Sequence, residues 1–469
     1  MSREARCDIA VIGGGPAGSA VALRLAALGH DVCLLERRAF PRRHVGEALS
    51  AGVGPQLEFL GVSAAIERAG FLRFAAARVR WSTDRFEHRP AHAGALTVDR
   101  GRFDHILLAA ARRVGVRVWQ PATARRAARS AAGWRIEAET GEGPLALAAD
   151  FVIDATGRSG FLPRQRVKIS PRTIALYGYW GGARLPTEPR IEAGERQWYW
   201  GSPVPGCGFN AMVFVDADDR RRAGKPLAAR YRALIGESGL LAGARAARLE
   251  SPVFACDATC YCDAFASGPG YLKVGEASFA IDPLSSTGVQ KAIQTALAAA
   301  VVAHTILLRP AAADTARAFY RDDQRHSVAQ HAQWSAESYG AHRRHADREF
   351  WRRRARPDRD RQPREELAPP VAWSASDRVA LSPRVAVRDV PCLVGDFVEA
   401  HPAVTHPALA RPVSFVEGVS LAELLGHLRP GVTASEVGAA LSRRLPVQGA
   451  LRLLDWLIQN DLLRPLPQP

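Results

Sequence analysis

The sequence predicts an α/β fold with a parallel sheet that binds a dinucleotide, a second mixed β-sheet and a small C-terminal unit. Three observations support this prediction. An apolar strand near the start of the chain runs into a glycine-rich turn and then a helix. Strand-like segments separated by Gly and Pro fill the middle of the chain. Residues 352–370 are rich in Arg, Asp and Pro, as in a linker between domains.

The dinucleotide site is predicted from residues 8–36. Asp8–Ile12 is a short apolar run typical of a buried parallel strand. A G-x-G-x-x-G pattern follows, in which the first glycine allows a tight turn, the second lets the backbone approach a pyrophosphate, and the third lets a helix pack closely. The turn consists of Gly13, Gly15, Pro16, Ala17 and Gly18 with one further glycine. Glu36 ends the second strand, close to the spacing of roughly 20 residues at which an acid reaches a ribose hydroxyl.

The composition fits a globular protein of several domains with a strongly basic charge. The chain has 469 residues, of which 47% are hydrophobic, and a formal net charge of +16. Arginine dominates this charge, and only four of the 63 basic residues are lysines: Lys168, Lys225, Lys273 and Lys291. The bias is either a compositional habit or a positive surface for an anionic partner, such as an acidic protein, a nucleic acid or a membrane face.

Cysteine usage and hydropathy favour a cytoplasmic protein without a metal site. The chain has seven cysteines, and the cluster of Cys256, Cys260 and Cys262 lacks a fourth ligand at a spacing typical of metal sites. No signal peptide precedes the first strand, and no apolar run reaches roughly 18 residues. We therefore expect a soluble protein in a reducing compartment, with no membrane insertion.

Further elements follow from apolar periodicity. Asp99 is a candidate N-cap for the helix that begins in Val98–Asp104. The loop at 282–288 opens a long helix to about Leu308, and a helix rich in His and Arg is predicted over 313–354. The segments 174–184, 197–203 and 209–216 predict an antiparallel sheet in a separate layer.

These elements predict a Rossmann-type domain with an inserted mixed β-sheet domain. The C-terminal unit contains a predicted strand pair within 379–390 and three short helices at 420–428, 434–445 and 449–459, an order that resembles a winged helix. The nucleotide-binding domain is expected to comprise 1–75, 97–170 and 264–310. The substrate domain is expected to comprise 76–96 and 171–263, followed by a helical region and linker, 311–370, and the winged-helix-like domain, 371–469.

Five motifs in order carry a family resemblance. They are the glycine turn with Glu36, Arg43–Glu47, Val98–Asp104, Asp154–Gly160, and Gly275–Ala277 with Asp282–Gly288. This series, within residues 5–345, resembles the class A flavoprotein monooxygenases and their relatives, the flavin-dependent halogenases and geranylgeranyl reductases. The resemblance implies a fold of the hydroxybenzoate-hydroxylase type with FAD as its cofactor.

The resemblance also implies which residues contact FAD. Arg43 and Arg100 would approach its ribityl and phosphate portion. Gly288 and Val289, at a helix N-terminus, would contact the isoalloxazine carbonyl edge, where the positive helix end favours negative charge. Glu276 stands where the family usually has Asp, and this longer acid would shift the ribityl contact. The full implied set is Gly13, Gly15, Pro16, Ala17, Gly18, Glu36, Arg37, Arg43, Arg100, Ala124, Asp154, Gly157, Glu276, Gly288 and Val289.

Hydroxylation, halogenation and reduction of a double bond all occur among these relatives. Halogenases share the Arg43–Glu47 loop and carry W-x-W-x-I-P, which Trp198–Pro203 nearly matches. They also need a lysine downstream of that loop to capture hypohalous acid. This chain has no lysine before Lys168, and arginine cannot replace it because arginine stays protonated. Trp198 and Trp200 either pack as core or line, with Tyr179, a pocket for a flat aromatic substrate.

Together with its C-terminal unit, the chain resembles a group of flavin-dependent tryptophan hydroxylases. These enzymes help to build the cysteine tryptophylquinone cofactor of quinohemoprotein amine dehydrogenase. This resemblance implies that the substrate is a Trp side chain in a partner polypeptide, the small subunit of a quinone-cofactor amine dehydrogenase. NAD(P)H would reduce FAD, and O2 would form a C4a-hydroperoxide that transfers oxygen to the indole. His44, Glu47 and Asp282 are candidate bases, each with an alternative role as a cap or a solvated loop residue.

Two other functions fit parts of the pattern. A small-molecule aromatic hydroxylase, or a halogenase-like or geranylgeranyl-reductase-like flavoenzyme, would use the C-terminal unit only for oligomerisation. A flavoprotein that binds nucleic acid would use that unit to read DNA. However, helix 434–445 carries only Arg443 and Arg444, both at its end, which is a thin footprint for phosphates. We therefore expect no nucleic-acid partner.

Overall fold

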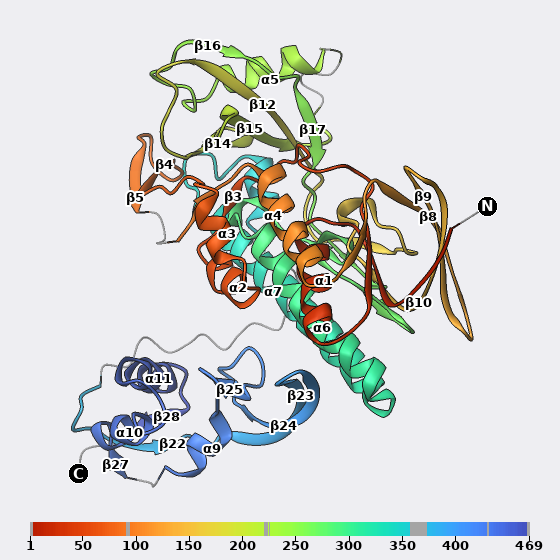
Figure 1. Ribbon diagram of the computed structural model, residues 1–469. Coiled ribbons are helices and arrows are strands. Elements are labelled where there is room, and N and C mark those ends of the chain that lie inside the picture. Colours follow the sequence, from red (N-terminus) through yellow and green to blue (C-terminus); the bar gives the residue numbers. More distant parts are fainter. Residues whose placement is uncertain are drawn as a thin grey trace. The chain divides into compact units, whose positions relative to one another are not determined.

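The computed structural model describes residues 3–90, 94–219, 224, 226–356, 373–428 and 431–466. The chain forms two compact units: Met1–His304 with Tyr320–Arg359, and Thr305–Phe319 with Asp360–Pro469. The first unit is an α/β structure built on two large sheets, as the sequence predicted (Figure 1).

The first sheet is mainly parallel and places the glycine turn at the ends of its strands. Its order is β19-β20-β10-β1-β2-β7, and the pairs from β20 to β7 are parallel. Every residue of β2 is buried, which explains why such strands read as continuous apolar runs. The bounds are β1 (Arg3–Ile12), β2 (Val32–Leu35), β7 (Arg117–Trp119), β10 (Gly143–Asp154), β19 (Ser267–Gly268) and β20 (Tyr271–Lys273), with β8 (Ala122–Ser130) and β9 (Gly133–Thr140) continuing antiparallel from β10.

The helices up to residue 354 lie in the first unit, except that residues 305–319 belong to the second. Asp99 caps α4, as predicted, because its Oδ1 accepts a hydrogen bond from the backbone N of Arg102 at 2.7 Å. By length and composition α6 could also cross a membrane, but 67% of its apolar window is buried within the protein, as in a core helix. The helices are α1 (Pro16–Ala27), α2 (Val53–Phe59), α3 (Ser63–Arg68), α4 (Arg100–Arg113), α5 (Leu227–Gly236), α6 (Gly288–Leu308), α7 (Ala313–Gly340) and α8 (Glu349–Arg354).

The second sheet has the order β16-β12-β15-β14-β13-β4-β5, with β17 on β12. All its pairs are antiparallel except β13 with β4. Helix α5 covers one face, as Figure 1 shows, and packs Tyr231 and Leu234 against it. The opposite face carries Trp198, Met212 and Phe214. The strands are β4 (Ala76–Arg80), β5 (Glu87–Pro90), β12 (Thr173–Ala183), β13 (Arg190–Ala193), β14 (Gln197–Val204), β15 (Gly208–Asp216), β16 (Arg245–Leu249) and β17 (Phe254–Asp257).

Short strands complete the first unit. A two-residue pair, β3 with β6, stands next to the loop that carries Glu47. A three-stranded sheet, β11-β18-β21, precedes the start of α6. Their bounds are β3 (Ala48–Leu49), β6 (Leu96–Thr97), β11 (Arg166–Lys168), β18 (Tyr261–Asp263) and β21 (Phe279–Ala280).

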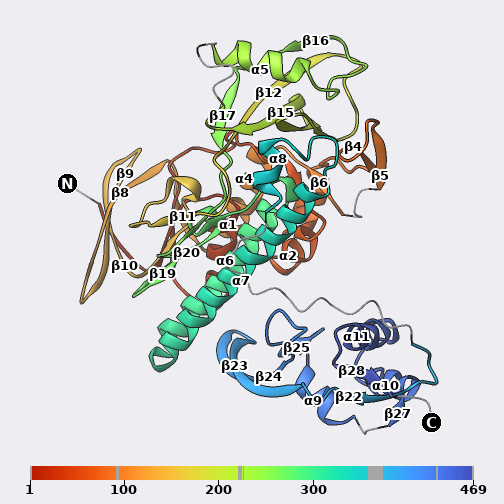
Figure 2. The same cartoon turned by 180° about the vertical axis from the view of Figure 1, so that it is seen from behind.

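The single helix predicted over 313–354 is wrong, because α7 ends at Gly340 and α8 begins at Glu349, both visible from behind in Figure 2. His342 accounts for the break. This buried side chain donates from Nδ1 to the carbonyl oxygen of Trp81 at 2.6 Å, and its Nε2 accepts from the backbone N of His345 at 3.1 Å. The two bonds fix a turn where the helix would otherwise continue.

From residue 373 on, the described part of the second unit contains three helices and three small sheets. The strand pair predicted within 379–390 is wrong in its pairing, since β22 pairs with β27 and β28, whereas β23 pairs with β24. The three predicted helices are present, and Thr433 caps α10 in a reciprocal capping box with Glu436. The elements are β22 (Arg378–Leu381), β23 (Ala386–Val394), β24 (Phe397–Thr405), β25 (Phe415–Val416), β26 (Val419–Ser420), α9 (Leu421–Gly426), β27 (Val432–Thr433), α10 (Ala434–Leu441), α11 (Val447–Gln459) and β28 (Leu463–Pro465).

Candidate functional site

One cavity of about 730 Å³ runs from the glycine turn to the Trp198 face of the second sheet, within the first unit. Most residues predicted to bind cofactor line it: Gly13, Gly15, Pro16, Ala17, Glu36, Arg37, Arg43, Arg100, Ala124, Gly157, Glu276, Gly288 and Val289. The candidate catalytic and pocket residues that line it are His44, Glu47, Asp282, Trp198 and Trp200. Gly18, Asp154 and Tyr179 do not, and each has another role described below.

The glycine turn has the geometry expected of a phosphate cradle. Gly13 has φ +107°, and a Cβ there would lie 2.5 Å from the carbonyl oxygen of Ala155. A Cβ at Gly18 would lie 1.8 Å from the carbonyl oxygen of Gly13, so α1 can approach β1 only with glycine at this position. A Cβ at Gly15 would meet only the Arg42 guanidinium, at 3.6 Å. The turn is therefore tight where backbone packs and open where a ligand would sit.

Glu36 is buried beside this turn and has both carboxylate oxygens engaged. Oε2 accepts from the backbone N of Gly14 at 2.7 Å, and Oε1 accepts from the backbone N of Arg38 at 2.9 Å. The side chain thus orders the glycine turn while its carboxylate lines the cavity. A contact between Glu36 and a ribose hydroxyl stays a prediction.

Arg42 is a cavity residue that the sequence reasoning missed in favour of its neighbour Arg43. Its Nη2 lies 3.2 Å from Asp104 Oδ2, while its Nη1 is buried with no hydrogen-bond partner among the described residues. Burial lowers the pKa of the Arg42 guanidinium, although Asp104 and Glu36 oppose this effect. An unpartnered guanidinium nitrogen beside an open glycine is the donor arrangement that a phosphate oxygen would complete.

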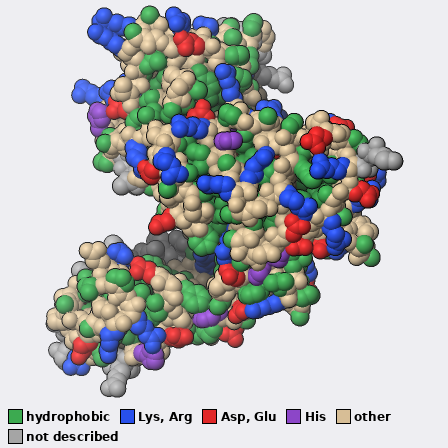
Figure 3. All heavy atoms as spheres, in the orientation of Figure 1, with side chains coloured by type: hydrophobic (Ala, Val, Ile, Leu, Met, Phe, Trp, Pro, Cys, Tyr) green, Lys and Arg blue, Asp and Glu red, His purple; other side chains and the backbone are tan. Residues whose placement is uncertain are grey.

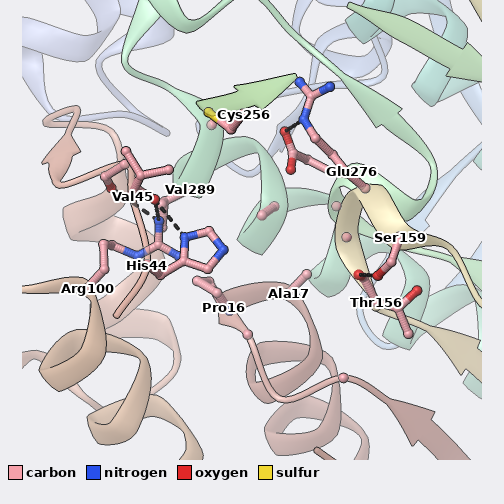
Figure 4. A pocket seen from close by; sticks show the side chains of 18 of the residues that line it. Pro16, Ala17, His44, Val45, Arg100, Thr156, Ser159, Cys256, Glu276 and Val289 are labelled. Carbon is pink, nitrogen blue, oxygen red and sulfur yellow. Dashed lines mark hydrogen bonds and ion pairs between the residues drawn. The ribbon is translucent and has the colours of Figure 1, made fainter. Parts of the chain in front are cut away.

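Arg100 and Asp154 act on loops of the cavity wall. Arg100 Nη1 donates to the carbonyl oxygens of Val45 and Gly46, each at 3.2 Å, and thereby holds the 43–47 loop (Figure 4). Asp154 is fully buried, and its Oδ2 accepts from the backbone N of Phe161 and of the next residue, both at 2.9 Å. Asp154, one of the residues implied to contact FAD, therefore shapes the loop that carries Gly157 and is not among the residues that line the cavity.

The other end of the cavity is formed by the start of α6 and the segment before it. Figure 4 shows Val289 close to Val45 and His44, and Glu276 across the cavity from them. Glu276 Oε1 lies 3.2 Å from Arg158 Nε. Burial raises the pKa of Glu276, but Arg158 and then Lys291 outweigh this effect and lower it overall. Lys291, one turn into α6, also lines the cavity and was not predicted from the sequence.

His44 is a neutral acceptor in this cavity. Its Nδ1 donates to the carbonyl oxygen of Val45 at 2.7 Å, which leaves Nε2 as the unprotonated ring nitrogen. Enclosure by the surrounding protein, followed by the charge of Arg100, lowers the pKa of His44 to about 4. At neutral pH the imidazole is therefore uncharged and able to accept a proton at Nε2.

Glu47 ends the 43–47 loop, and its side chain is buried against the second sheet. Its Oε1 accepts from the Tyr179 hydroxyl at 2.6 Å and from Asn210 Nδ2 at 3.1 Å, and its Oε2 accepts from the backbone N of Gly46 at 2.9 Å. Burial raises the pKa of Glu47, although these hydrogen bonds lower it in part. Tyr179 therefore holds Glu47 and is not itself one of the residues that line the cavity.

Asp282 supports the turn that leads into α6. Its Oδ1 accepts from the backbone N of Leu284 at 3.0 Å, and the Tyr339 hydroxyl lies 3.2 Å from Oδ1 and 3.1 Å from Oδ2. Burial raises the pKa of this carboxyl, and the hydrogen bonds counteract it only in part. Asp282 thus caps the short 3₁₀ turn Pro283–Ser285 as well as lining the cavity.

The second sheet makes the far wall aromatic. Trp198 and Trp200 lie on the same face of β14, as alternate residues of a strand do. The Trp198 ring stacks on Phe214 with centroids 3.8 Å apart and meets Trp81 edge-on at 6.3 Å. Trp198 therefore packs in the core and also lines the cavity, and a role with an aromatic substrate stays a prediction.

These residues fit a flavin dinucleotide. The open glycine and the unpartnered Arg42 nitrogen suit a pyrophosphate, Glu36 suits a ribose, and the start of α6 supplies backbone N–H groups at the other end. Among the described residues, no group of three or more His, Cys, Asp or Glu side chains could hold a metal ion. The arrangement suits chemistry carried by an organic cofactor against an aromatic wall.

Sequence comparison finds similarity to flavin enzymes. A family model described as FAD dependent oxidoreductase matches residues 8–170. Tryptophan 2-halogenase of Chondromyces crocatus is 30% identical over 342 residues, covering 68% of this chain and 65% of the relative. Flavin-dependent halogenase armH4 of Armillaria mellea is also 30% identical over 342 residues, covering 62% of this chain and 64% of the relative. The chain thus matches slightly less than two thirds of the length of these curated relatives.

Solved structures resemble nearly the whole chain. The peptidyl tryptophan dihydroxylase QhpG, essential for tryptophylquinone cofactor biogenesis, superposes with a TM-score of 0.71 at 27% identity, over 98% of this chain and 100% of that chain. CmlS, a flavin-dependent halogenase, superposes with a TM-score of 0.77 at 22% identity, over 98% of this chain and 96% of that chain. The second similarity shows the fold alone.

Proposed function

We propose that this chain, which is similar to the FAD dependent oxidoreductase family over residues 8–170 and to flavin-dependent halogenases, is a FAD-dependent monooxygenase that hydroxylates a Trp side chain in a partner polypeptide. The added oxygen would prepare the indole for conversion into a quinone cofactor. NAD(P)H is the proposed reductant and O2 the co-substrate, and the proposed partner is the small subunit of a quinone-cofactor amine dehydrogenase. We place this enzyme in the cytoplasm.

One observation carries the proposal. The similarity to QhpG covers 98% of this chain and all of that chain at 27% identity, and so includes the second unit. The halogenase CmlS also covers 98% of this chain, so the second unit by itself does not separate the two activities, but its identity is only 22%. The higher identity to an enzyme that acts on a peptidyl tryptophan supports a polypeptide substrate, and we propose the sequence-based domain boundaries as well.

The chain's own residues would bind, orient and dehydrate the substrate. FAD bound in the cavity would supply reducing equivalents and activate O2. Trp198 and Trp200 offer flat apolar faces to an indole, which is already electron-rich, so positioning it and excluding water are the protein's main tasks. His44 Nε2 and the Glu47 carboxylate are the groups proposed to accept the proton that the indole carbon loses.

The charge pattern on the face shown in Figure 3 favours a polypeptide partner over a nucleic acid. Over the described residues on the face shown in Figure 3, blue Lys and Arg side chains are scattered among green and red ones. A phosphate-binding surface would gather its basic side chains in one stripe or patch.

The test uses full-length protein loaded with FAD and mixed with the small-subunit polypeptide, NADH or NADPH, and air. We expect the polypeptide to gain the mass of one or two oxygens, with fragmentation locating them on a Trp. A reaction without the nicotinamide serves as the control. The proposal fails if the polypeptide is unchanged while free aromatic compounds accelerate NAD(P)H oxidation.

A halogenase-like activity is the second candidate, because the curated relatives at 27–30% identity are flavin-dependent halogenases. The lysine content argues against it, since none of the four lysines precedes residue 168. Adding bromide and a flavin reductase to the same assay separates the two. A product in which bromine replaces hydrogen would support halogenation, whereas an oxygen gain unaffected by bromide supports hydroxylation.

A further inference from the structure

Two lysines of the first unit are buried, and their surroundings differ. Lys273 is 1% exposed, and its Nζ lies 3.1 Å from Asp263 Oδ2. Lys291 is 3% exposed and lines the cavity, but it forms no salt bridge among the described residues. Its Nζ donates to the carbonyl oxygen of Phe279 at 2.5 Å and lies 4.5 Å from the centre of the Phe279 ring. Burial lowers the pKa of Lys291 to about 8, although the charge of Glu276 opposes this effect. The ammonium therefore stays charged at neutral pH.

The charged side chains that interact with Lys291 are Glu276 and Arg158. Glu276 is already paired with Arg158 at 3.2 Å, and all three side chains line the cavity. The other titratable groups that interact with Lys291 are Cys260 and His331, from the segment before β18 and from α7. Burial raises the pKa of Cys260 and lowers that of His331, so both groups are uncharged at neutral pH. Neither group offsets the lysine.

Lys291 also lies at the N-terminal end of helix α6, whose partial positive charge adds to that of the lysine. Its backbone N donates to the Thr287 carbonyl oxygen at 2.8 Å, so it lies in the first turn of α6. The N-terminal end of a helix carries a partial positive charge. The ammonium and the helix end therefore favour an anion at the same end of the cavity, where Gly288 and Val289 form the wall.

We propose that Lys291 tunes the bound flavin by favouring its anionic reduced form. Two electrons and one proton convert oxidised FAD to a reduced cofactor with one negative charge on the ring. A fixed positive charge stabilises that product relative to the neutral starting ring, and so raises the midpoint potential. This inference rests on the flavin chemistry proposed above but does not depend on the identity of the substrate.

The experiment measures the midpoint potential of bound FAD in the full-length holoenzyme by equilibration with a reference dye. K291Q keeps a donor for the Phe279 carbonyl and removes the charge, whereas K291R keeps the charge. For a unit charge about 10 Å away at an effective dielectric constant of about 20, Coulomb's law gives about a tenfold effect. We therefore expect K291Q to lower the potential by about 30 mV, since tenfold corresponds to about 30 mV for a two-electron couple.

The controls separate charge from structure. K291R should keep the wild-type potential, and K168Q, which removes an exposed lysine on β11, should leave it unchanged. E276Q should shift the potential upward, because it removes a negative charge from the same wall. If K291Q does not bind FAD, the potential of E276Q still tests whether charges on this wall shift the flavin potential.

Three outcomes would overturn the inference. They are a wild-type potential in FAD-loaded K291Q, an equal loss in K291Q and K291R, and no upward shift in E276Q. By contrast, wild-type protein that binds no FAD at all would contradict the proposed function itself.

Discussion

Glu47 shows how one side chain depends on two structural layers. It lies in the 43–47 loop, yet its carboxylate accepts hydrogen bonds from Tyr179 and Asn210 of the second sheet. Such a residue can act as a base or can fasten the loop to the sheet. Because the pKa of Glu47 is raised, the effect of its ionisation depends on pH, whereas the effect of its packing does not.

We expect the stability difference between E47Q and wild type to shift in favour of E47Q as pH rises. Burial raises the folded-state pKa of Glu47 above the ordinary value of 4.5. The native wild type therefore binds a proton that the unfolded chain releases, and it loses stability as pH rises from 4.5 through the folded-state pKa. Glutamine cannot lose that proton. Thermal unfolding of both proteins at pH 5 and pH 8 tests this, and a pH-independent difference would contradict it.

Arg42 and Arg43 provide the second prediction at this scale. R42Q should weaken FAD binding by roughly 10- to 100-fold, the effect of losing a charge-assisted hydrogen bond of about 1.5–3 kcal/mol. R43Q is the matched comparison: Arg43 also lines the cavity, but its side chain is exposed and not buried like the Arg42 Nη1, so its loss should change affinity only a few-fold. Titration of apoprotein with FAD measures both. Equal losses would show that Arg42 holds no special place.

The sequence predicted backbone roles better than side-chain directions. Gly13, Gly18 and Glu36 were found because a phosphate cradle needs glycines and an acid at fixed spacing. Arg42 could not be separated from Arg43, since neighbouring residues in a loop differ only in which way the loop turns. Tyr179 was predicted as a pocket residue, but it contacts Glu47 from β12.

At the scale of elements, α1 can pack closely against β1 only because Gly18 has a hydrogen atom in place of a side chain. G18A should abolish FAD binding and destabilise the protein by about 3 kcal/mol or more, because a Cβ would lie 1.8 Å from the Gly13 carbonyl oxygen. G54A is the control within a helix. No atom lies within 4 Å of a Cβ at Gly54, so it should stabilise α2 by about 0.5–1 kcal/mol.

Melting temperatures with and without FAD distinguish the two glycine variants. G18A should melt at the same temperature whether or not FAD is present. G54A should gain as much from FAD as the wild type does. A G18A protein that binds FAD normally would show that α1 can shift away from β1.

Local periodicity predicted most helices and strands, but contacts between distant residues decided where some end. The break after α7 follows from the bond of His342 to Trp81, 261 residues apart in the chain. The pairing of β22 with β28 likewise joins residues that no local pattern relates. Such contacts are fixed only when the whole chain packs, so periodicity alone missed them.

At the scale of the whole molecule, FAD should act on the first unit and leave the second unchanged. The residues that line the cavity lie within 12–292. Saturating FAD, at about 100 times its Kd, stabilises whatever binds it by about 2.7 kcal/mol. Hydrogen exchange should therefore slow in the cavity segments around 12–17, 36–48 and 274–292, with no change in 373–428 and 431–466.

A mutant that cannot bind FAD, such as G18A, serves as the control for that exchange experiment. Protection in the second unit that appears only with FAD would contradict the prediction and would indicate coupling between the units. The α/β class and the flavin site could be predicted from the sequence because five motifs occur in order. The winged-helix comparison for the second unit stays a prediction.

The aromatic face of the second sheet has a practical consequence. Trp198 and Trp200 line the cavity, and Trp81 and Trp351 pack in the same cluster, out of 10 tryptophans in the chain. Indole emission overlaps flavin absorption, so cofactor loading should quench the fluorescence of this cluster by energy transfer. Tryptophan fluorescence should therefore report whether FAD is bound. A W198F variant would show how much of the change in fluorescence comes from the cavity wall.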